Sequence, residues 1–499
     1  MFVQQTIQNL AHFLPETVLA ITFCAALLAG LIFRTTPKAA GWVAFFGVMT
    51  ALFFVINQAG TSEEIFSGMI AVDPFAVFFK SFAAVCALII FLFSMISIEV
   101  QATVKRMAEY YALLVSMTLG MFLMAGAVNL LMMVLAMELT SLSSYILAGY
   151  TKEASASSEA SLKYIMYGAV SSGVMLYGVS ILFGLSGAMN YAGINRALAL
   201  NAPQYSALLI ATIFIVVGFG YKISAVPFHF WTPDVYEGAP ITITAFLSVA
   251  SKAAGFAMMM RFFKVIFIDT TVLTLPPGVW TSLYNFEWNK ILVILSVLTM
   301  TLGNLVAVWQ DNLKRLLAYS SIAQAGYMLM GVVLLSDKGI AAVLIYFVMY
   351  LCMNLGAFYV VMLVANKTGS EDISVYRGIG YRSPMIGVAM AVFLLSLTGL
   401  PPTAGFVGKF YLFAAVLDAR WIWLAVVGAI NSVISLYYYA RVLRYMFLRG
   451  PEDQSGLLTL IRTEVLILLV LALPTLIFGL YFAPIVDLAN ASVQMFGLH

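Results

Sequence analysis

The chain has 499 residues, of which 63% are hydrophobic and only 9% are charged, and its mean hydropathy is +1.00. Charged residues make up about a quarter of a typical soluble domain, so this composition excludes a soluble enzyme and predicts a polytopic membrane protein built of helices. The net charge of +3 and the lack of any basic run also exclude a nucleic-acid binder. The N-terminal residues carry neither a basic start nor a small-residue cleavage site, so we expect them to lead straight into the first span.

Apolar segments long enough to cross a bilayer recur along the whole chain. They predict an all-α fold of about fourteen transmembrane helices, at 14–33, 39–57, 75–98, 108–126, 129–149, 161–184, 206–230, 240–267, 290–308, 316–335, 339–364, 385–416, 421–447 and 463–482. Helix ends that are read from a sequence vary by a few residues.

Basic residues in the short loops indicate which side of the protein faces the cytoplasm. With the N-terminus outside, the larger basic set falls on the cytoplasmic side: Arg34, Lys38, Lys105, Arg106, Lys152, Lys314, Arg315, Lys367, Arg377, Arg382, Arg441, Arg444, Arg449 and Arg462. The opposite side holds the smaller set of Arg196, Arg261, Lys264, Lys290, Lys338 and Arg420. We therefore expect both termini on the periplasmic side.

Two segments of the chain resemble each other, which predicts an internal duplication. MELTSLSSYILAGY in the fifth span is similar to AYSSIAQAGYMLMG in the tenth, with Tyr145 set against Tyr327. Each half also has one span interrupted by proline, at Pro227 and at Pro401 with Pro402, and such breaks survive in a bilayer only where protein or water covers them. Five helices separate the two sets, so the copies would be inverted, as in transporters whose sites lie at paired broken helices. The predicted division is a three-helix unit at 1–107, two five-helix repeats at 108–268 and 289–447, and a final helix at 463–482.

Four ionisable residues lie deep inside the predicted spans: Glu138, Lys222, Lys252 and Lys409. Each costs about 2.5–3.5 kcal/mol at mid-bilayer, and such groups persist where they pair or line a hydrated path. Glu138 and Lys222 are expected to form an ion pair, because a carboxylate and an ammonium can both stay charged when they neutralise each other. For the three lysines, the alternative is a side chain that snorkels to the interface. We interpret the set as a relay that moves charge, most simply protons.

Other polar residues are weaker candidates for this relay. Lys163 lies four residues after Glu159, a spacing typical of an exposed helical salt bridge, so proton uptake is its second interpretation. His229 could titrate near neutral pH at a cytoplasmic opening, or it could be an ordinary loop histidine. Gln324 could hold a water chain between two of the deep lysines, or only join helices. Lys80 lies close to an acidic outer loop and is expected to snorkel toward it.

The cysteines and histidines suggest no metal site. The chain has three of each, and none are spaced as zinc, haem or iron–sulfur ligands. Cys24, Cys86 and Cys352 all lie in apolar stretches, where we expect small buried side chains. No glycine-rich loop opens a helix, so nucleotide binding has no support. The sequence thus predicts no metal, cofactor or redox centre in this chain.

Three motifs resemble a known family. VPFHFWTPDVYEGAP at 226–240, LKRLLAYSSIAQAGY at 313–327 and LTGLPPTAGFVGKFYLF at 397–413 are similar to the antiporter-like membrane subunits of respiratory complex I, which are related to subunits of Mrp-type cation/proton antiporters. The resemblance covers essentially the whole chain. It implies fourteen helices, with inverted five-helix repeats over helices 4–8 and 9–13 and with breaks in helices 7 and 12.

The resemblance also implies roles for individual residues. The family's relay positions fall on Glu138 in helix 5, Lys163 in helix 6, Lys222 in helix 7, Lys252 in helix 8 and Lys409 in helix 12. A lysine at the last position and a chain that ends soon after helix 14 resemble the N-type subunits, which lie nearest the quinone-binding arm. Relatives often have histidine where this chain has Gln324. Glutamine cannot take up and release a proton, so water held by Gln324 would have to make the central link.

The function implied by the resemblance is proton translocation in a NADH:quinone oxidoreductase. The chain would be a non-redox subunit of the membrane arm, and protons would pass from Lys163 or Lys222 to Lys252 and Lys409. FMN, iron–sulfur clusters and quinone would lie in partner subunits, which would include a second antiporter-like subunit and the small subunits toward the quinone arm. The expected membrane is the bacterial plasma membrane or, alternatively, the thylakoid. Alternatives of the same fold are a subunit of an Mrp-type Na⁺/H⁺ antiporter or of a membrane-bound hydrogenase, and an alternative of another class is a structural subunit whose lysines carry no protons.

Overall fold

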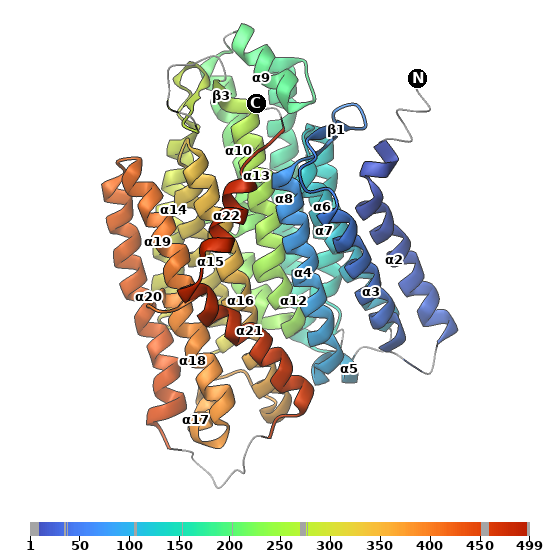
Figure 1. Cartoon of the computed structure of the whole chain (residues 1–499), viewed down its shortest axis with the longest axis vertical. Helices are drawn as coiled ribbons and strands as arrows, with labels where there is room; N and C mark the ends of the chain where they lie inside the picture. The colour runs from blue at the N-terminus through green and yellow to red at the C-terminus, as the bar shows by residue number, and fades with distance from the viewer. Residues whose placement is uncertain are drawn as a thin grey trace.

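The protein is a bundle of long helices (Figure 1). The computed structural model describes residues 9–33, 36, 38–103, 107–151, 153–201, 203–269, 276, 278–450 and 459–496. Within these ranges, twelve helices are long and apolar enough to cross a membrane. They are α2 (Leu14–Ile32), α3 (Lys38–Ile56), α4 (Pro74–Ile96), α6 (Met107–Gly126), α7 (Leu130–Ala148), α8 (Ser155–Ser186), α10 (Tyr205–Ile223), the continuous helix Ile241–Phe267, α14 (Trp288–Ala307), α16 (Asp337–Thr368), α20 (Ile422–Leu448) and α21 (Arg462–Leu480). The prediction of an all-α polytopic membrane protein is confirmed.

Three more helices lie among these spans. α15 (Leu313–Val332) is long but more polar than the twelve, while α18 (Pro384–Thr398) and α19 (Ala404–Asp418) are two halves of one predicted span. Counting α15 as a span and the two halves as another would give the fourteen that the sequence predicts. That count, the inverted repeats and the boundaries at 1–107, 108–268, 289–447 and 463–482 stay predictions.

Both predicted helix interruptions are present. α10 is followed by Ser224, which has a positive φ of 62°, and the chain turns through Pro227 before α11 (Trp231–Gly238) begins. α18 is followed by Gly399, whose φ of +91° suits a residue without a side chain, and Pro401 and Pro402 precede α19. Each break therefore releases the last carbonyls of a helix inside the protein.

The centre of the bundle is formed by two helices that are enclosed by other helices on all sides. One is the helix at Ile241–Phe267, which consists of α12 (Ile241–Phe246), a π-helical turn at Leu247–Ser251 and α13 (Lys252–Phe267). The other is α16, and the two are buried along nearly their whole length. Figure 1 shows α12, α13 and α16 between the N-terminal helices α2–α4 on one side and α18–α20 on the other.

Short elements, which were not predicted from the sequence, connect the long helices. They are α5 (Ile98–Thr103), α9 (Tyr191–Leu200), α17 (Ile379–Arg382), α22 (Ala483–Ala491) and the 3₁₀ turns Leu283–Asn285 and Ile373–Tyr376. Two antiparallel pairs of strands also form, β1 (Glu63–Ile65) with β2 (Ile70–Val72) and β3 (Ile268–Asp269) with β4 (Thr281–Ser282). All are too short to show a periodic pattern in the sequence.

Two buried ion pairs hold the N-terminal helices to the bundle. Arg261 makes two parallel hydrogen bonds to Asp73, at 2.6 and 2.8 Å, and both side chains are 0% exposed. Lys80 forms an ion pair with Glu16 of α2 at 2.6 Å, so the expectation that Lys80 snorkels is wrong. Snorkelling fails here because a carboxylate from a neighbouring helix reaches the ammonium inside the protein.

Several other sequence expectations need correction. Cys86 and Cys352 are buried as expected, whereas Cys24 is exposed on α2. Lys314, counted as a cytoplasmic loop residue, is 2% exposed, and Arg261 and Lys264 of the opposite set are also buried. Arg34, Lys105, Arg106 and Lys152 lie outside the described residues. The expected orientation of the termini stays a prediction.

Candidate functional site

Lys222 lies in the last turn of α10, just before the first helix break. The side chain is 2% exposed, and its ammonium donates a hydrogen bond to Ser141 Oγ on α7 at 3.2 Å. Glu138 is one turn away from Ser141 on the same helix face, and its charge acts on Lys222. The expected direct ion pair between Glu138 and Lys222 is wrong, because the serine hydroxyl occupies the place next to the ammonium. One oxygen of Glu138 is enclosed and accepts no hydrogen bond from the described residues.

The stem of Lys222 packs on the helix that carries Lys252. A Cβ added at Gly255 would come within 3.1 Å of Lys222 Cγ, which is closer than an ordinary van der Waals contact, so the glycine lets the lysine stem lie tightly against this helix. Gly255 lies three residues after Lys252 and therefore on the same side of α13. The two lysines thus come from helices that touch directly.

Lys252 begins α13, immediately after the π-helical turn Leu247–Ser251. A π turn widens the helix locally and is frequent at functional sites. The Lys252 side chain is 2% exposed, and its ammonium donates to Ser321 Oγ of α15 at 2.9 Å. It also lies 5.9 Å from the centre of the Tyr236 ring. Snorkelling is excluded for this residue, because its ammonium is bonded inside the bundle.

Lys409 lies on α19, beside the second helix break. Its ammonium donates to the Thr398 carbonyl at 2.8 Å and to Ser432 Oγ at 3.2 Å, and it lies 4.4 Å from the centre of the Tyr327 ring. Thr398 is the last residue of α18, so its carbonyl has no partner within that helix and carries the negative end of the helix dipole. The break thus supplies the backbone oxygen that stabilises the ammonium.

Gln324 lies on α15 between the residues that contact Lys252 and Lys409. Its amide nitrogen donates to the Leu397 carbonyl at 3.0 Å, and its amide oxygen accepts from the Tyr346 hydroxyl. Ser321, Gln324 and Tyr327 are spaced by three residues and share one face of α15. Along this face, hydroxyl and amide groups therefore connect the surroundings of Lys252 to those of Lys409.

Beyond Lys409, a buried polar network links α14, α15 and α20. Ser432 and Asn304 both donate to the Tyr327 hydroxyl, at 3.4 and 3.2 Å. Asn304 also contacts Asn431 at 3.4 Å and accepts from Tyr438 at 3.0 Å. This network was not predicted from the sequence, because single polar residues in long apolar segments show no spacing that would bring them together.

Lys163 belongs to a partly exposed ionic network. Its ammonium contacts Glu159 at 2.6 Å, as its spacing predicts, and also Asp234 on α11 at 2.7 Å. Arg315 on α15 joins the network through Asp234 at 2.8 Å and Glu237 at 2.7 Å. The Lys163 side chain is 38% exposed, so it can exchange protons with water. A role for Lys163 in proton uptake stays a prediction.

His229 lies in the first helix break, between α10 and α11. The residue is 9% exposed, and its ring stacks obliquely on Phe230, with 4.6 Å between the ring centres. Its Nδ1 is buried and has no partner among the described residues. Lys252 is the charged group that acts on it electrostatically.

The described residues include no cluster of three or more histidine, cysteine, aspartate or glutamate side chains that could hold a metal ion. The site is instead a row of buried lysines, each next to hydroxyl or carbonyl oxygens. Together with the bundle of broken and unbroken helices, this row defines a multi-pass membrane protein with an internal chain of protonatable groups.

Comparison with known proteins identifies the family. A family profile described as NADH:quinone oxidoreductase/Mrp antiporter, transmembrane, matches residues 127–435. NADH-quinone oxidoreductase subunit N 2 of Chloroherpeton thalassium is 47% identical over 498 residues, which cover 97% of this chain and 94% of that protein. The chain belongs to the NADH:quinone oxidoreductase/Mrp antiporter transmembrane family.

Solved structures share the fold. A chain of respiratory complex I from Thermus thermophilus with bound aureothin is 29% identical, with a TM-score of 0.78 over 95% of this chain and 99% of that chain. A chain of the Mrp complex from Dietzia is 20% identical, with a TM-score of 0.79 over 99% and 97% of the two chains, and at this identity it shows a common fold only. The chain is thus an antiporter-like membrane subunit, of a kind found in multi-subunit complexes.

Proposed function

We propose that this chain is the N-type subunit of the membrane arm of a NADH:quinone oxidoreductase, where it conducts protons and carries no redox centre. The observation that supports this most is the kind of partner that the three lysines of the row have. Lys222, Lys252 and Lys409 donate to hydroxyl or carbonyl oxygens, whereas the buried Lys80 is paired with a carboxylate. A proton can leave an ammonium held by neutral oxygens without breaking an ion pair and leaving a buried anion behind. The three lysines are therefore suited to exchange protons, while Lys80 is suited to hold helices together.

Protons enter the row from the cytoplasmic side near Lys163 or Lys222 and move by way of Lys252 to Lys409. Two unit charges about 10–12 Å apart interact by roughly 1–2 kcal/mol at an effective dielectric constant near 20. That energy corresponds to about a tenfold change in the proton affinity of the neighbouring group. A charge that arrives on one lysine therefore favours release from the next.

Gln324 does not itself carry the proton, because an amide neither gains nor loses one near neutral pH. Its oxygen and nitrogen are both bonded to the protein, to Tyr346 and to the Leu397 carbonyl. The passage between Lys252 and Lys409 therefore uses the adjoining hydroxyls, Ser321 among them, together with ordered water. Gln324 holds the broken end of α18 beside this passage.

The proposed function implies particular neighbouring subunits and a particular membrane. The chain contacts a second antiporter-like subunit and the small subunits toward the quinone arm, and the FMN, iron–sulfur clusters and quinone lie in other subunits. It resides in the bacterial plasma membrane, with the thylakoid membrane as the alternative, and both termini face the periplasmic side or its equivalent.

Three other functions are alternatives to this one. The fold shared with the Mrp complex supports a subunit of an Mrp-type Na⁺/H⁺ antiporter, and a subunit of a membrane-bound hydrogenase is a further alternative of the same fold. The higher identity to the relatives from NADH-quinone oxidoreductase favours the first proposal. A structural subunit with an inactive lysine row is the alternative of a different class.

Gentle purification through a tag on this chain, followed by assays of NADH oxidation with quinone, tests the assignment. Co-purifying flavin and iron–sulfur clusters with inhibitor-sensitive turnover are expected. A complex without redox centres that exchanges Na⁺ for H⁺ would contradict the proposal in favour of an antiporter, and hydrogen-linked activity would favour a hydrogenase. In the intact complex, Lys222→Met is expected to abolish pumping with normal assembly, and unchanged pumping would favour the structural alternative.

A further inference from the structure

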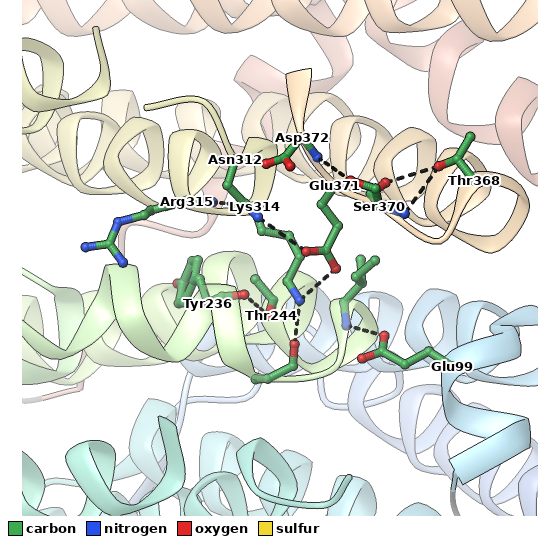
Figure 2. Close-up of polar contacts among 12 residues, drawn as sticks. Glu99, Tyr236, Thr244, Asn312, Lys314, Arg315, Thr368, Ser370, Glu371 and Asp372 are labelled. Carbon is green, nitrogen blue, oxygen red and sulfur yellow. Dashed lines mark hydrogen bonds and ion pairs between the residues drawn. The ribbon is translucent and has the colours of Figure 1, made fainter. Parts of the chain in front are cut away.

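Three charged side chains from distant parts of the chain meet at the joint between α11 and α12 (Figure 2). Lys314, near the start of α15, donates to the Ala239 carbonyl at 2.9 Å and contacts Glu371 at 3.1 Å. Glu99 of α5 accepts a hydrogen bond from the Ile241 N–H at 3.2 Å. Ala239 and Ile241, on either side of the joint, are thus bonded to side chains of opposite charge. We call Glu99, Lys314 and Glu371 the joint cluster.

The joint cluster supplies the hydrogen-bond acceptor that the residue before α12 lacks. The residue before α12 is Pro240, which offers no side-chain oxygen to cap the first N–H groups of the helix. Glu99 supplies an acceptor and a negative charge at that helix end from another part of the chain. Burial raises the pKa of the Glu99 carboxyl above its usual range, while Lys314 and the Ile241 N–H oppose the rise and Glu371 adds to it.

The burial of Lys314 shows how firmly the joint is held. Its side chain is 3% exposed, and that of Glu371 is 24% exposed. Glu371 is itself held at the start of α15, because its backbone carbonyl accepts from the Leu313 N–H at 2.9 Å and its side chain contacts Asn312 at 3.4 Å. A buried ammonium with a carbonyl and a carboxylate as neighbours has little freedom to move, since any displacement leaves its charge without a partner.

α15 carries both Lys314, which contacts the joint, and Ser321, which is the partner of Lys252. Lys314 and Ser321 are seven residues apart, which is about two helical turns and roughly 10 Å along the axis. Ser321 accepts the hydrogen bond from Lys252, and the joint lies at the start of the helix that carries Lys252. The long helix that carries Lys252 is therefore linked to α15 at two levels: Lys314 bonds the Ala239 carbonyl just before this helix begins, and Ser321 bonds Lys252 within the bundle.

We propose that the joint cluster positions Lys252 for proton transfer, with Lys314 and Glu99 as positioning residues. They fix the position of the start of α12. The long helix that begins there then places the Lys252 ammonium 2.9 Å from Ser321 Oγ. A displacement of about 1 Å directed along the line from Nζ to Oγ would stretch this contact beyond hydrogen-bonding distance. The inference rests on the proposed function, because it concerns the use of Lys252 in the relay.

The test uses the intact complex in inverted membrane vesicles, with proton uptake measured per quinone reduced. Lys314→Met is expected to lower the uptake roughly tenfold, because a hydrogen bond from a charged group is lost, and to move its pH profile. Lys314→Arg keeps the charge and the donors and is expected to restore most of the uptake. Lys338→Met removes a lysine from an exposed pair with Asp418 and is the control, expected to leave uptake and profile unchanged.

A second comparison separates positioning from a general structural role. In a Lys252→Arg background the residue at 252 no longer titrates and uptake is expected to fall to a residual rate, which adding Lys314→Met is expected to leave unchanged. A further fall of this residual rate when Lys314→Met is added would overturn the inference. If Lys314→Met prevents assembly, Glu99→Gln takes its place, because it keeps an acceptor for the Ile241 N–H and removes only the charge. A Glu99→Gln complex whose pH profile matches that of the wild type would also overturn it.

Lys222→Met, measured in parallel, separates a failure of the joint cluster's role from a failure of the proposed function. Loss of uptake in Lys222→Met without an effect of Lys314→Met would contradict the role of the joint cluster alone. Unchanged uptake in Lys222→Met would contradict the proposed function itself.

Discussion

Replacing Ser141 by alanine tests whether the Lys222 ammonium exchanges protons during turnover. The Ser141 hydroxyl is the hydrogen-bond partner of that ammonium among the described residues, and Lys222 is 2% exposed. A hydrogen bond to a charged group contributes about 1.5–3 kcal/mol. Without it the charged form of Lys222 is less stable by that amount, so the lysine loses its proton at a pH about one to two units lower. The Lys222 side chain itself is unchanged in this variant.

The assay is the pH dependence of proton uptake by inverted membrane vesicles that oxidise NADH. Ser141→Ala is expected to move the alkaline limb of the profile toward lower pH by about one to two units, while the complex assembles normally. Ser143→Ala is the matched control. It removes a hydroxyl from the same helix that bonds Ser116 at 3.0 Å and not Lys222, so the profile is expected to stay in place.

Two results would refute this reasoning. If Ser141→Ala leaves the profile where it was, Lys222 does not titrate in the step that limits uptake. If Ser143→Ala shifts the profile as much as Ser141→Ala, the effect comes from the packing of α7 and not from the Lys222 ammonium.

Three further outcomes are expected. Ser432→Ala removes one of two oxygens from the Lys409 ammonium and is expected to slow proton uptake at most about tenfold, because the carbonyl at the helix break remains; complete loss in an assembled complex would contradict this. Asp73→Asn leaves the Arg261 guanidinium buried without its counter-charge and is expected to destabilise the subunit by about 3–5 kcal/mol, measured by thermal unfolding in detergent. Gly405→Ala would bring a Cβ within 1.8 Å of a backbone carbonyl of α18, so the second break should distort and the level of assembled complex fall; a normal level would show that the break can adjust.

The sequence predicted helix positions better than it predicted the pairing of polar groups. Depth in the membrane follows from the number of apolar residues on either side, which is why Lys222, Lys252 and Lys409 lie inside the bundle as expected. The direction in which a side chain points, unlike its depth, does not follow from the number of apolar neighbours in the sequence. α7 carries polar residues on several of its sides, so its sequence does not tell which face carries Glu138 toward a partner, and Ser141 takes the place beside Lys222 that the predicted ion pair gave to Glu138.

The same limit explains the corrections to other lysines. Lys80 and Lys314 lie near helix ends, where a lysine often reaches water, and the sequence alone favours that interpretation. Both are buried because carboxylates far away in the sequence, Glu16 and Glu371, fold next to them. The helix breaks were predictable for the opposite reason, since proline acts on its own backbone and needs no distant partner.

The hydrogen bond from the Phe496 N–H to Asp73 has a consequence for biogenesis. It joins residues 423 positions apart and completes the shell of partners around the buried Asp73 carboxylate. At about 5–20 residues per second, a ribosome needs roughly 20–80 seconds to travel between these two positions. During that interval α4 already lies in the membrane with its carboxylate incompletely bonded. A chain that stops short of residue 496 keeps this defect, which gives the membrane's proteases a physical difference by which to distinguish it from a finished subunit.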